Sequence, residues 1–303
     1  KSRAACRRPW SWPRSVRTKR RLAKRNRHEQ RRCLLAIVVP LEERSFPFCL
    51  LDNGFRMLQE LPPGIRQRNT AGAPLQQAGL QAIRQLFELE FPKFDLAVIE
   101  SGTQLRPSEV AEDIEGTLHR LRSGPGLTPS TLELDLGPHD PDPKLWRKRF
   151  EAMCRLAKQL TVAVLVIPAS PLGASFDEEV KRLSSLVEFM GREGLVLTVP
   201  THSATLTADP AQAIALCKAV PGLGLTLDPS HYTNGPTKVG NYDGVYPYVR
   251  HVQFRDTGKQ PGAFQVKVGS GDIEYTRIVS LLERQGYDRA LSISIWDELG
   301  SPF

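Results

Sequence analysis

Within residues 195–255 the chain reads LVLTV at Leu195–Val199, LGLTLD at Leu223–Asp228 and VRHVQFR at Val249–Arg255. These runs are rich in Val and Leu and are short, which favours buried strands over helices. Each run is separated from the next by a segment long enough for a helix, and parallel strands need such a crossover connection. The alternation therefore predicts βα units around a parallel sheet.

The same alternation continues outward from these runs. Apolar residues at spacings of three or four predict helices after Pro107, over 145–160 and over 176–190. Asp209 before Pro210 is typical of a helix N-cap. Helices are also expected over 74–89 and 273–286, and four more strands at Phe94–Ile99, Thr131–Leu136, Thr161–Ile167 and Ala290–Ile295. Seven strands in this order predict an α/β fold, a (β/α)8 TIM barrel.

The eighth strand has two candidates. Ile65–Thr70 stands at the expected position but has weak β character, whereas Leu34–Val39 has strong β character but would leave a connection of over thirty residues. Because long structureless connections are uncommon, we favour Ile65–Thr70. This predicts an extension over 1–64 and a barrel over 65–303. With little chain after the last strand, the customary final helix is expected to be absent or replaced.

The positive charge of the chain is concentrated near its start. Residues 1–32 hold 14 of the 41 Lys and Arg residues and one of the 33 acids, Glu29. Such a run binds polyanions through its charge, so any nucleic-acid binding is expected to be non-specific and confined to this segment. It lacks the apolar core of a secretory signal. We predict a disordered basic extension.

The five cysteines form neither a CxxC pair nor a Cys/His cluster with zinc spacing, which indicates free thiols in a reducing compartment. The longest apolar stretches, of about eight residues, are far below the ~20 that span a bilayer. We therefore predict a cytoplasmic protein that acts on a small molecule, without a membrane, and that can form a homo-oligomer.

The ends of the predicted strands carry the candidate site, since TIM barrels place their chemistry there. Asp228 ends one strand and His231 lies in the turn after it, while His251 and Arg255 share one face of the next. Arg255 either pairs with Asp256 or binds an anionic group of a substrate. We predict catalytic roles for Asp228, His231 and His251, and substrate binding by Glu100, Asp135, His202, Arg255 and Asp256.

The order DPSH, HVQFRD, VGSGDIEY and GYDRALSIS resembles the C-terminal half of the xylose isomerase-like TIM barrel superfamily, the sugar phosphate isomerases and epimerases. The resemblance covers residues 90–298. It implies a carbohydrate substrate and a divalent metal (Mn, Mg, Co or Zn) held by a Glu on strand five, an Asp on strand six, a His on strand seven and a Glu on strand eight. It also implies that the two glutamates move the proton.

This chain departs from that pattern at three of the four positions. Asp228 matches, but Pro200, Gln253 and Ser294 stand where the resemblance implies Glu, His and Glu. Proline cannot bind a metal, and neither Gln nor Ser is a strong ligand for a hard cation. Two outcomes stay open, a weak metal site that includes Asp228 and His231, or no metal at all.

Three hypotheses for the function follow. The first is a sugar or sugar-phosphate isomerase or epimerase that transfers a proton next to a carbonyl group, and the second is a barrel that binds a carbohydrate-like ligand without metal or turnover. The third is a lyase similar to inosose dehydratase. An apurinic endonuclease would share the fold but needs a cluster of about nine His, Asp and Glu ligands for its zinc ions. The six histidines of the chain argue against it.

Overall fold

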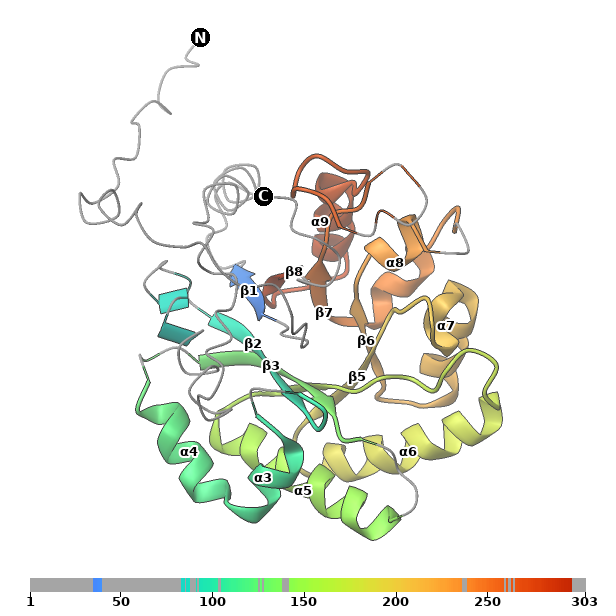
Figure 1. Ribbon diagram of the computed structural model, residues 1–303. Coiled ribbons are helices and arrows are strands. Elements are labelled where there is room, and N and C mark those ends of the chain that lie inside the picture. The colour runs from blue at the N-terminus through green and yellow to red at the C-terminus, as the bar shows by residue number, and fades with distance from the viewer. Residues whose placement is uncertain are drawn as a thin grey trace, which may run out of the picture. The chain divides into compact units, whose positions relative to one another are not determined.

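The computed structural model describes residues 35–39 and most of 83–295, with gaps at 85, 88–90, 92, 103–104, 125, 127, 138–141, 236–238, 259, 261–262 and 264. Eight strands close into a barrel in sequence order (Figure 1). They are β1 (Leu35–Val39), β2 (Lys93–Ile99), β3 (Thr128–Asp135), β4 (Val164–Val166), β5 (Val196–Pro200), β6 (Gly224–Leu227), β7 (Val249–Phe254) and β8 (Leu291–Ile295). The seven strands predicted from apolar runs are confirmed as β2 to β8.

The helices lie on the outer side of the strands (Figure 1). They are α3 (Pro107–Glu112), α4 (Ile114–Arg122), α5 (Pro143–Gln159), α6 (Phe176–Arg192), α7 (Pro210–Ala219), α8 (Ser230–Thr233) and α9 (Tyr275–Arg284), with 3-10 turns η2 (Leu206–Ala208) and η3 (Asp243–Tyr248). The predicted N-cap is confirmed, because the Asp209 side chain accepts from the backbone N–H of Ala211 at 2.9 Å. Of the helix expected over 74–89, the described residues 83–84 and 86–87 are helical.

The helix expected after Pro107 is two helices, α3 and α4. Asp113 leaves the helical conformation with φ −143° and ψ 80°, and its side chain accepts from the backbone N–H of Gly116 at 2.8 Å. A short acid that bonds the backbone three residues on is a typical N-cap. The apolar spacing continues across the break because both helices turn the same face toward the barrel.

The barrel is closed by β1, so the prediction that Ile65–Thr70 forms the closing strand is wrong. β1 pairs antiparallel with β2 and with β8, with Leu35 opposite Leu96 and Ile295. The physical reason is that the cost of a long connection grows only slowly with its length, whereas LAIVV is far more β-prone than IRQRNT. One strand of the barrel thus lies within the segment that we predicted to be an extension. Residues 1–34, 40–82 and 296–303, which include the basic segment and the place of the final helix, lie outside the described residues.

Alternation along each strand separates the barrel interior from the helix-facing core. Outward residues such as Leu132 and Leu134 belong to the same hydrophobic core as Phe150 and Met153 of α5, and all four are fully buried. Inward residues are largely polar, and the hydroxyl groups of Thr198 and Thr226 lie 2.8 Å apart. An inward polar set is unusual for TIM barrels, whose interiors are mostly branched apolar side chains. The interior of the barrel is therefore where a functional site is expected.

The structure also bears on the predictions about membrane spans and cysteines. In the described part of the chain, no helix is long and apolar enough to cross a membrane. Cys154 and Cys217 are free, buried thiols, and burial raises the pKa of each to about 12. Both are therefore protonated and unreactive at neutral pH.

Candidate functional site

Asp228 lies directly after β6 and is held rigidly. Its Oδ1 accepts from the backbone N–H of Ser230 at 2.9 Å and from the Ser230 hydroxyl at 2.5 Å. The Thr201 hydroxyl accepts from the Asp228 N–H at 2.9 Å and donates to its carbonyl at 3.0 Å. The residue is 3% exposed. The DPS sequence makes a tight turn of this kind, in which an Asp bonds the backbone two residues on.

The second oxygen of Asp228 is paired with Arg255. The Arg255 Nη2 lies 2.9 Å from Asp228 Oδ2, and Arg255 is only 4% exposed. Burial of a single charge is very costly, so each of these groups stabilises the other. The guanidinium therefore reaches across to the neighbouring strand end, and the two alternatives for Arg255, a pair with Asp256 or an anionic group of a substrate, both stay predictions.

Two histidines lie beside this pair. The His231 ring has its Nε2 3.7 Å from Asp228 Oδ2, and its centroid is 4.2 Å from that of His202. The Ser203 backbone N–H donates to Nδ1 of His231 at 3.3 Å, and the Ala204 backbone N–H donates to Nδ1 of His202 at 3.1 Å. An Nδ1 that accepts must be unprotonated, so each neutral ring carries its proton on Nε2.

Both rings are neutral at pH 7. Burial lowers the pKa of His231 to about 4, which outweighs the opposite effect of Asp228. Burial also lowers the pKa of His202, and the charge of Arg255 acts in the same direction. Neutral imidazoles can donate a hydrogen bond without adding charge. We call the surface lined by Asp228, His231, His202 and Arg255 the barrel mouth.

A second polar cluster lies deeper in the barrel. His251 Nε2 is 2.7 Å from Asp95 Oδ2 and 3.3 Å from the Ser292 hydroxyl, and the Ser130 hydroxyl bonds the other oxygen of Asp95. Burial raises the pKa of Asp95, but the charge and hydrogen bond of His251 outweigh it and leave that pKa below its usual value. Asp95 is thus an ionised partner of His251, and His251 is not part of the barrel mouth.

Glu133 contacts the deeper cluster through Gln253 and lies within electrostatic range of Arg255. The Gln253 amide nitrogen lies 3.3 Å from Glu133 Oε2 and 3.5 Å from Asp95 Oδ2. The pKa of Glu133 is raised to about 7, first by burial and then by the negative charge of Asp95, although Arg255 is close enough to oppose the rise. Glu133 is only half-buried. A partly accessible carboxyl group that titrates near neutral pH is typical of general acids and bases.

Asp95 and Glu133 are not among the predicted site residues, because they lie inside strands rather than at strand ends. Both are acids inside apolar strands, FDLAVI and TLELDL, and both have inward parity. A charged residue at such a position is seldom structural without a partner. Parity along the strand was therefore the signal that could have found them.

Three of the predicted residues lie apart from both clusters. Glu100 pairs with Arg149 at 3.0 Å and accepts from the Ser108 N–H at 3.0 Å. Asp135 accepts from the Gly137 N–H at 3.0 Å. Asp256 is buried and accepts backbone N–H groups of its own loop, which come from Thr257, Gly269 and Gly271 at 2.7–3.0 Å. These bonds give Asp256 a loop-organising role; substrate binding by the three residues stays a prediction.

The residues at the four implied ligand positions do not fit a divalent metal. Asp228 is the one carboxylate among them, and a guanidinium already occupies its second oxygen. The Gln253 amide presents its N–H toward acids rather than its oxygen to a cation. Pro200 and Ser294 add no charged ligand. Across the described residues, no three His, Cys, Asp or Glu side chains are arranged to hold a metal ion.

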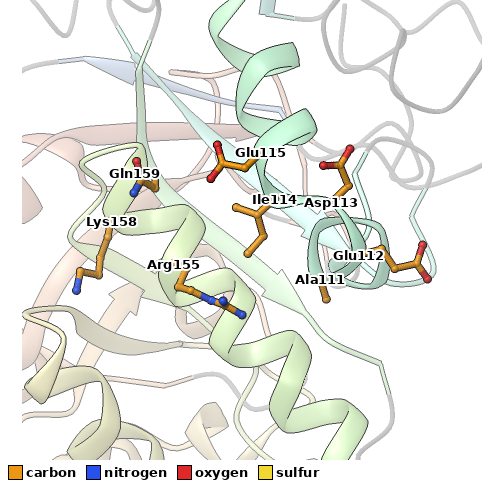
Figure 2. Close-up of a pocket in the computed structure, with 8 residues that line it drawn as sticks. All are labelled: Ala111, Glu112, Asp113, Ile114, Glu115, Arg155, Lys158 and Gln159. Atoms are coloured by element: carbon orange, nitrogen blue, oxygen red, sulfur yellow. The ribbon is translucent and has the colours of Figure 1, made fainter.

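A surface pocket of about 530 Å³ lies away from the barrel mouth. Figure 2 shows it between the junction of α3 and α4 and the end of α5, with Arg155 extending beneath Ile114. Its charged lining residues are Glu112, Asp113, Glu115, Arg155 and Lys158. None of them belongs to either cluster, so the pocket is not part of the candidate site.

Comparison with known proteins agrees with this fold. Residues 75–302 match the family described as xylose isomerase-like TIM barrel. No curated protein matches the chain.

Solved structures with the same fold are remote in sequence. A xylose isomerase-like TIM barrel protein from Mycobacterium smegmatis in complex with magnesium is 16% identical with a TM-score of 0.57, over 72% of this chain and 81% of that one. The 3-keto-D-glucoside 4-epimerase of E. coli is 15% identical with a TM-score of 0.53, over 74% and 88%. A D-allulose 3-epimerase from Methylomonas sp. is 14% identical with a TM-score of 0.55, over 72% and 79%. At these identities the likeness establishes the fold alone.

Proposed function

Because the chain belongs to the xylose isomerase-like TIM barrel family, we propose that it binds a sugar or sugar phosphate at the barrel mouth and transfers a proton on the carbon next to the carbonyl group. The observation that carries this proposal is Glu133, a half-buried acid on the inner wall of the barrel with one amide partner, Gln253. Its pKa of about 7 suits a group that must both take and return a proton. The epimerases among the structural neighbours are consistent with this chemistry.

The chain's own residues can account for each proton. The Glu133 carboxylate takes the proton from carbon, and the electron pair of the broken C–H bond forms the enediolate. His202 donates its Nε2 proton to the carbonyl oxygen and takes the proton of the neighbouring hydroxyl group, as a neutral imidazole can. Glu133 then returns its proton to the adjacent carbon. The products are the isomerised sugar and the original protein.

Isomerisation is favoured over epimerisation by the number of accessible acids. Inversion at one carbon commonly uses a base on each face of the substrate, whereas a shift between adjacent carbons needs one base. Among the described acids of the two clusters, Asp95 is engaged by His251 and Ser130, and Asp228 is engaged by Ser230 and Arg255. Glu133 is therefore the acid best suited to this role. We therefore propose an aldose–ketose isomerase, with epimerisation as the second possibility to be tested.

The test is exchange of carbon-bound hydrogen in D2O. The full chain is incubated with aldoses, ketoses and their phosphates, and loss of the C–H signal next to the carbonyl group is followed by NMR. We expect exchange with at least one pair of isomers, and a loss of about 10²–10⁴-fold in Glu133→Gln. Glu151→Gln, which alters a surface acid paired with Arg147, is the matched control.

A binding protein without turnover is the second candidate. The loss of both implied glutamates, at Pro200 and Ser294, favours it. In that case a sugar would raise the melting temperature of the full chain while every compound kept its carbon-bound hydrogen in D2O. Such a result would exclude the isomerase and retain the ligand site. The lyase hypothesis stays a prediction.

A further inference from the structure

The environment of Asp228 is already complete without a metal ion. Its Oδ1 accepts two hydrogen bonds from Ser230, and its Oδ2 lies 2.9 Å from the Arg255 guanidinium. The pair is almost fully buried, so solvent screens it little. A cation of the protein itself therefore stands where the resemblance to the family implies a divalent ion.

We propose that Arg255 replaces the divalent cation of this site, so that the barrel mouth of this chain works without a metal. This inference rests on the proposed function in one respect, that the barrel mouth is the ligand site. The guanidinium supplies the positive charge that stabilises negative charge developing on a ligand oxygen. Its pairing with Asp228 also fixes its position before the ligand binds.

Charge balance supports this assignment. One carboxylate and one guanidinium cancel, whereas a divalent ion with Asp228 and Arg255 would leave a buried net charge of about +2, and like charges at close range repel strongly when water is excluded. The residues at the other implied ligand positions fit a site that holds the single positive charge of a guanidinium rather than the double charge of a metal ion. Pro200 and Ser294 are uncharged, and Gln253 bonds Glu133 and Asp95 instead of facing Asp228.

The experiment measures binding of Mn²⁺ to the full chain by equilibrium dialysis. The wild-type chain is expected to bind no stoichiometric Mn²⁺ through Asp228. Ser294→Glu restores an acid on β8 but keeps Arg255, so it should bind no better. The double variant Ser294→Glu/Arg255→Gln removes the guanidinium as well and should bind at least about tenfold more tightly than Ser294→Glu.

The matched control is Ser294→Glu/Arg182→Gln. Arg182 also pairs with a buried carboxylate, Glu179, but on the outer wall of the barrel, so this control should bind like Ser294→Glu. If the double variant at Arg255 does not fold, Ser294→Glu/Arg255→Met takes its place, because methionine fills the same space without a charge.

Two results would overturn the inference. One is stoichiometric Mn²⁺ on the wild-type chain that Asp228→Asn abolishes, and the other is a folded double variant that binds no better than Ser294→Glu. The measurement requires no turnover. If the wild-type chain shows no exchange in D2O and the double variant gains Mn²⁺ binding, the isomerase is refuted and the replacement of the metal by Arg255 is supported.

Discussion

Two buried carboxylates in this barrel are held by the same three kinds of donor. At the barrel mouth, Asp228 accepts from Ser230 N–H at 2.9 Å and hydroxyl at 2.5 Å, and pairs with Arg255 at 2.9 Å. On the outer wall, Glu179 of α6 accepts from Ser170 N–H at 2.9 Å and hydroxyl at 2.6 Å, and pairs with Arg182 at 2.7 Å. The kinds of donor alone would not distinguish the two sites.

The surroundings of the two pairs differ. Arg182 has a side chain 32% exposed and bonds both oxygens of Glu179, so the outer pair lies on α6 next to water. Arg255 is 4% exposed and acts electrostatically on Glu133, His202 and His231. A buried ion pair is therefore weak evidence of function by itself. The titratable neighbours at the barrel mouth are what make it a candidate site.

The largest difference is expected when each arginine loses its charge. Arg255→Met leaves Asp228 buried without its cation and should lower the free energy of unfolding by about 3–5 kcal/mol. Arg182→Met should cost about 1 kcal/mol, because water can enter the place left by the partly exposed Arg182 side chain. Both losses are to be measured by urea denaturation at pH 7.

The control for this prediction is Arg255→Lys, which keeps the charge and should recover part of the loss. Equal losses in Arg255→Met and Arg182→Met would mean that the mouth pair is as well solvated as the outer one. The proposed distinction between the two sites would then be lost.

The strands could be predicted from the sequence because buried strands require continuous apolar runs. Runs such as TVAVLVI and LGLTLD must lie between two layers, so they identify β4 and β6, with ends off by one residue for β6 and by up to three for β4. The choice of Ile65–Thr70 over Leu34–Val39 failed because the cost of loop closure was weighted above β propensity. The break at Asp113 was hidden because an apolar face can continue across two helices.

The candidate site was predictable only in part. Strand-end positions correctly brought Asp228, His231, His202 and Arg255 together. The partner of Arg255 could not be chosen, because a sequence does not specify which way a long side chain turns across neighbouring strands. Glu133 was missed because it lies inside a strand, where its inward parity was the available signal. Its raised pKa could not be predicted, because that shift arises from burial and from Asp95 on the neighbouring strand β2.

A smaller effect is expected from pH, and it separates Glu133 from Glu179. The pKa of Glu133 is raised from 4.5 to about 7, so the folded chain holds a proton that the unfolded chain has lost, and this group makes stability fall as pH rises from 4.5 to 7. Glu133→Gln removes this loss, so the free energy of unfolding of the variant minus that of wild type should increase by roughly 3 kcal/mol between pH 4.5 and pH 8.

Glu179 is the opposite case. Burial raises its pKa, but Arg182 and Ser170 outweigh this and lower it below 4.5, so its contribution to stability is present above pH 4.5 and lost in acid. Glu179→Gln should thus remove stability at pH 8. Because His231 is protonated only near pH 4 when folded, it makes wild-type stability rise between pH 4 and 6.5, and each variant must be compared with wild type at every pH. A Glu133→Gln difference that does not change with pH would refute the shifted pKa.

The smallest effect is expected from the two serine hydroxyls, and it tests whether the local bonds are equivalent. Ser230→Ala and Ser170→Ala each remove one hydroxyl donor from a buried carboxylate that keeps its backbone donor and its arginine. Both should lower the free energy of unfolding by about 1 kcal/mol, as measured in urea. Only Ser230→Ala should also slow exchange in D2O, because it loosens the position of Asp228 and hence of Arg255, while Ser170→Ala should leave the rate unchanged. Equal stability losses with a slower rate in Ser230→Ala alone would show that the residues around the Asp228–Arg255 pair, and not its hydrogen bonds, distinguish the two sites. Equal rates in the two variants would show that the position of Asp228 has no influence on the reaction.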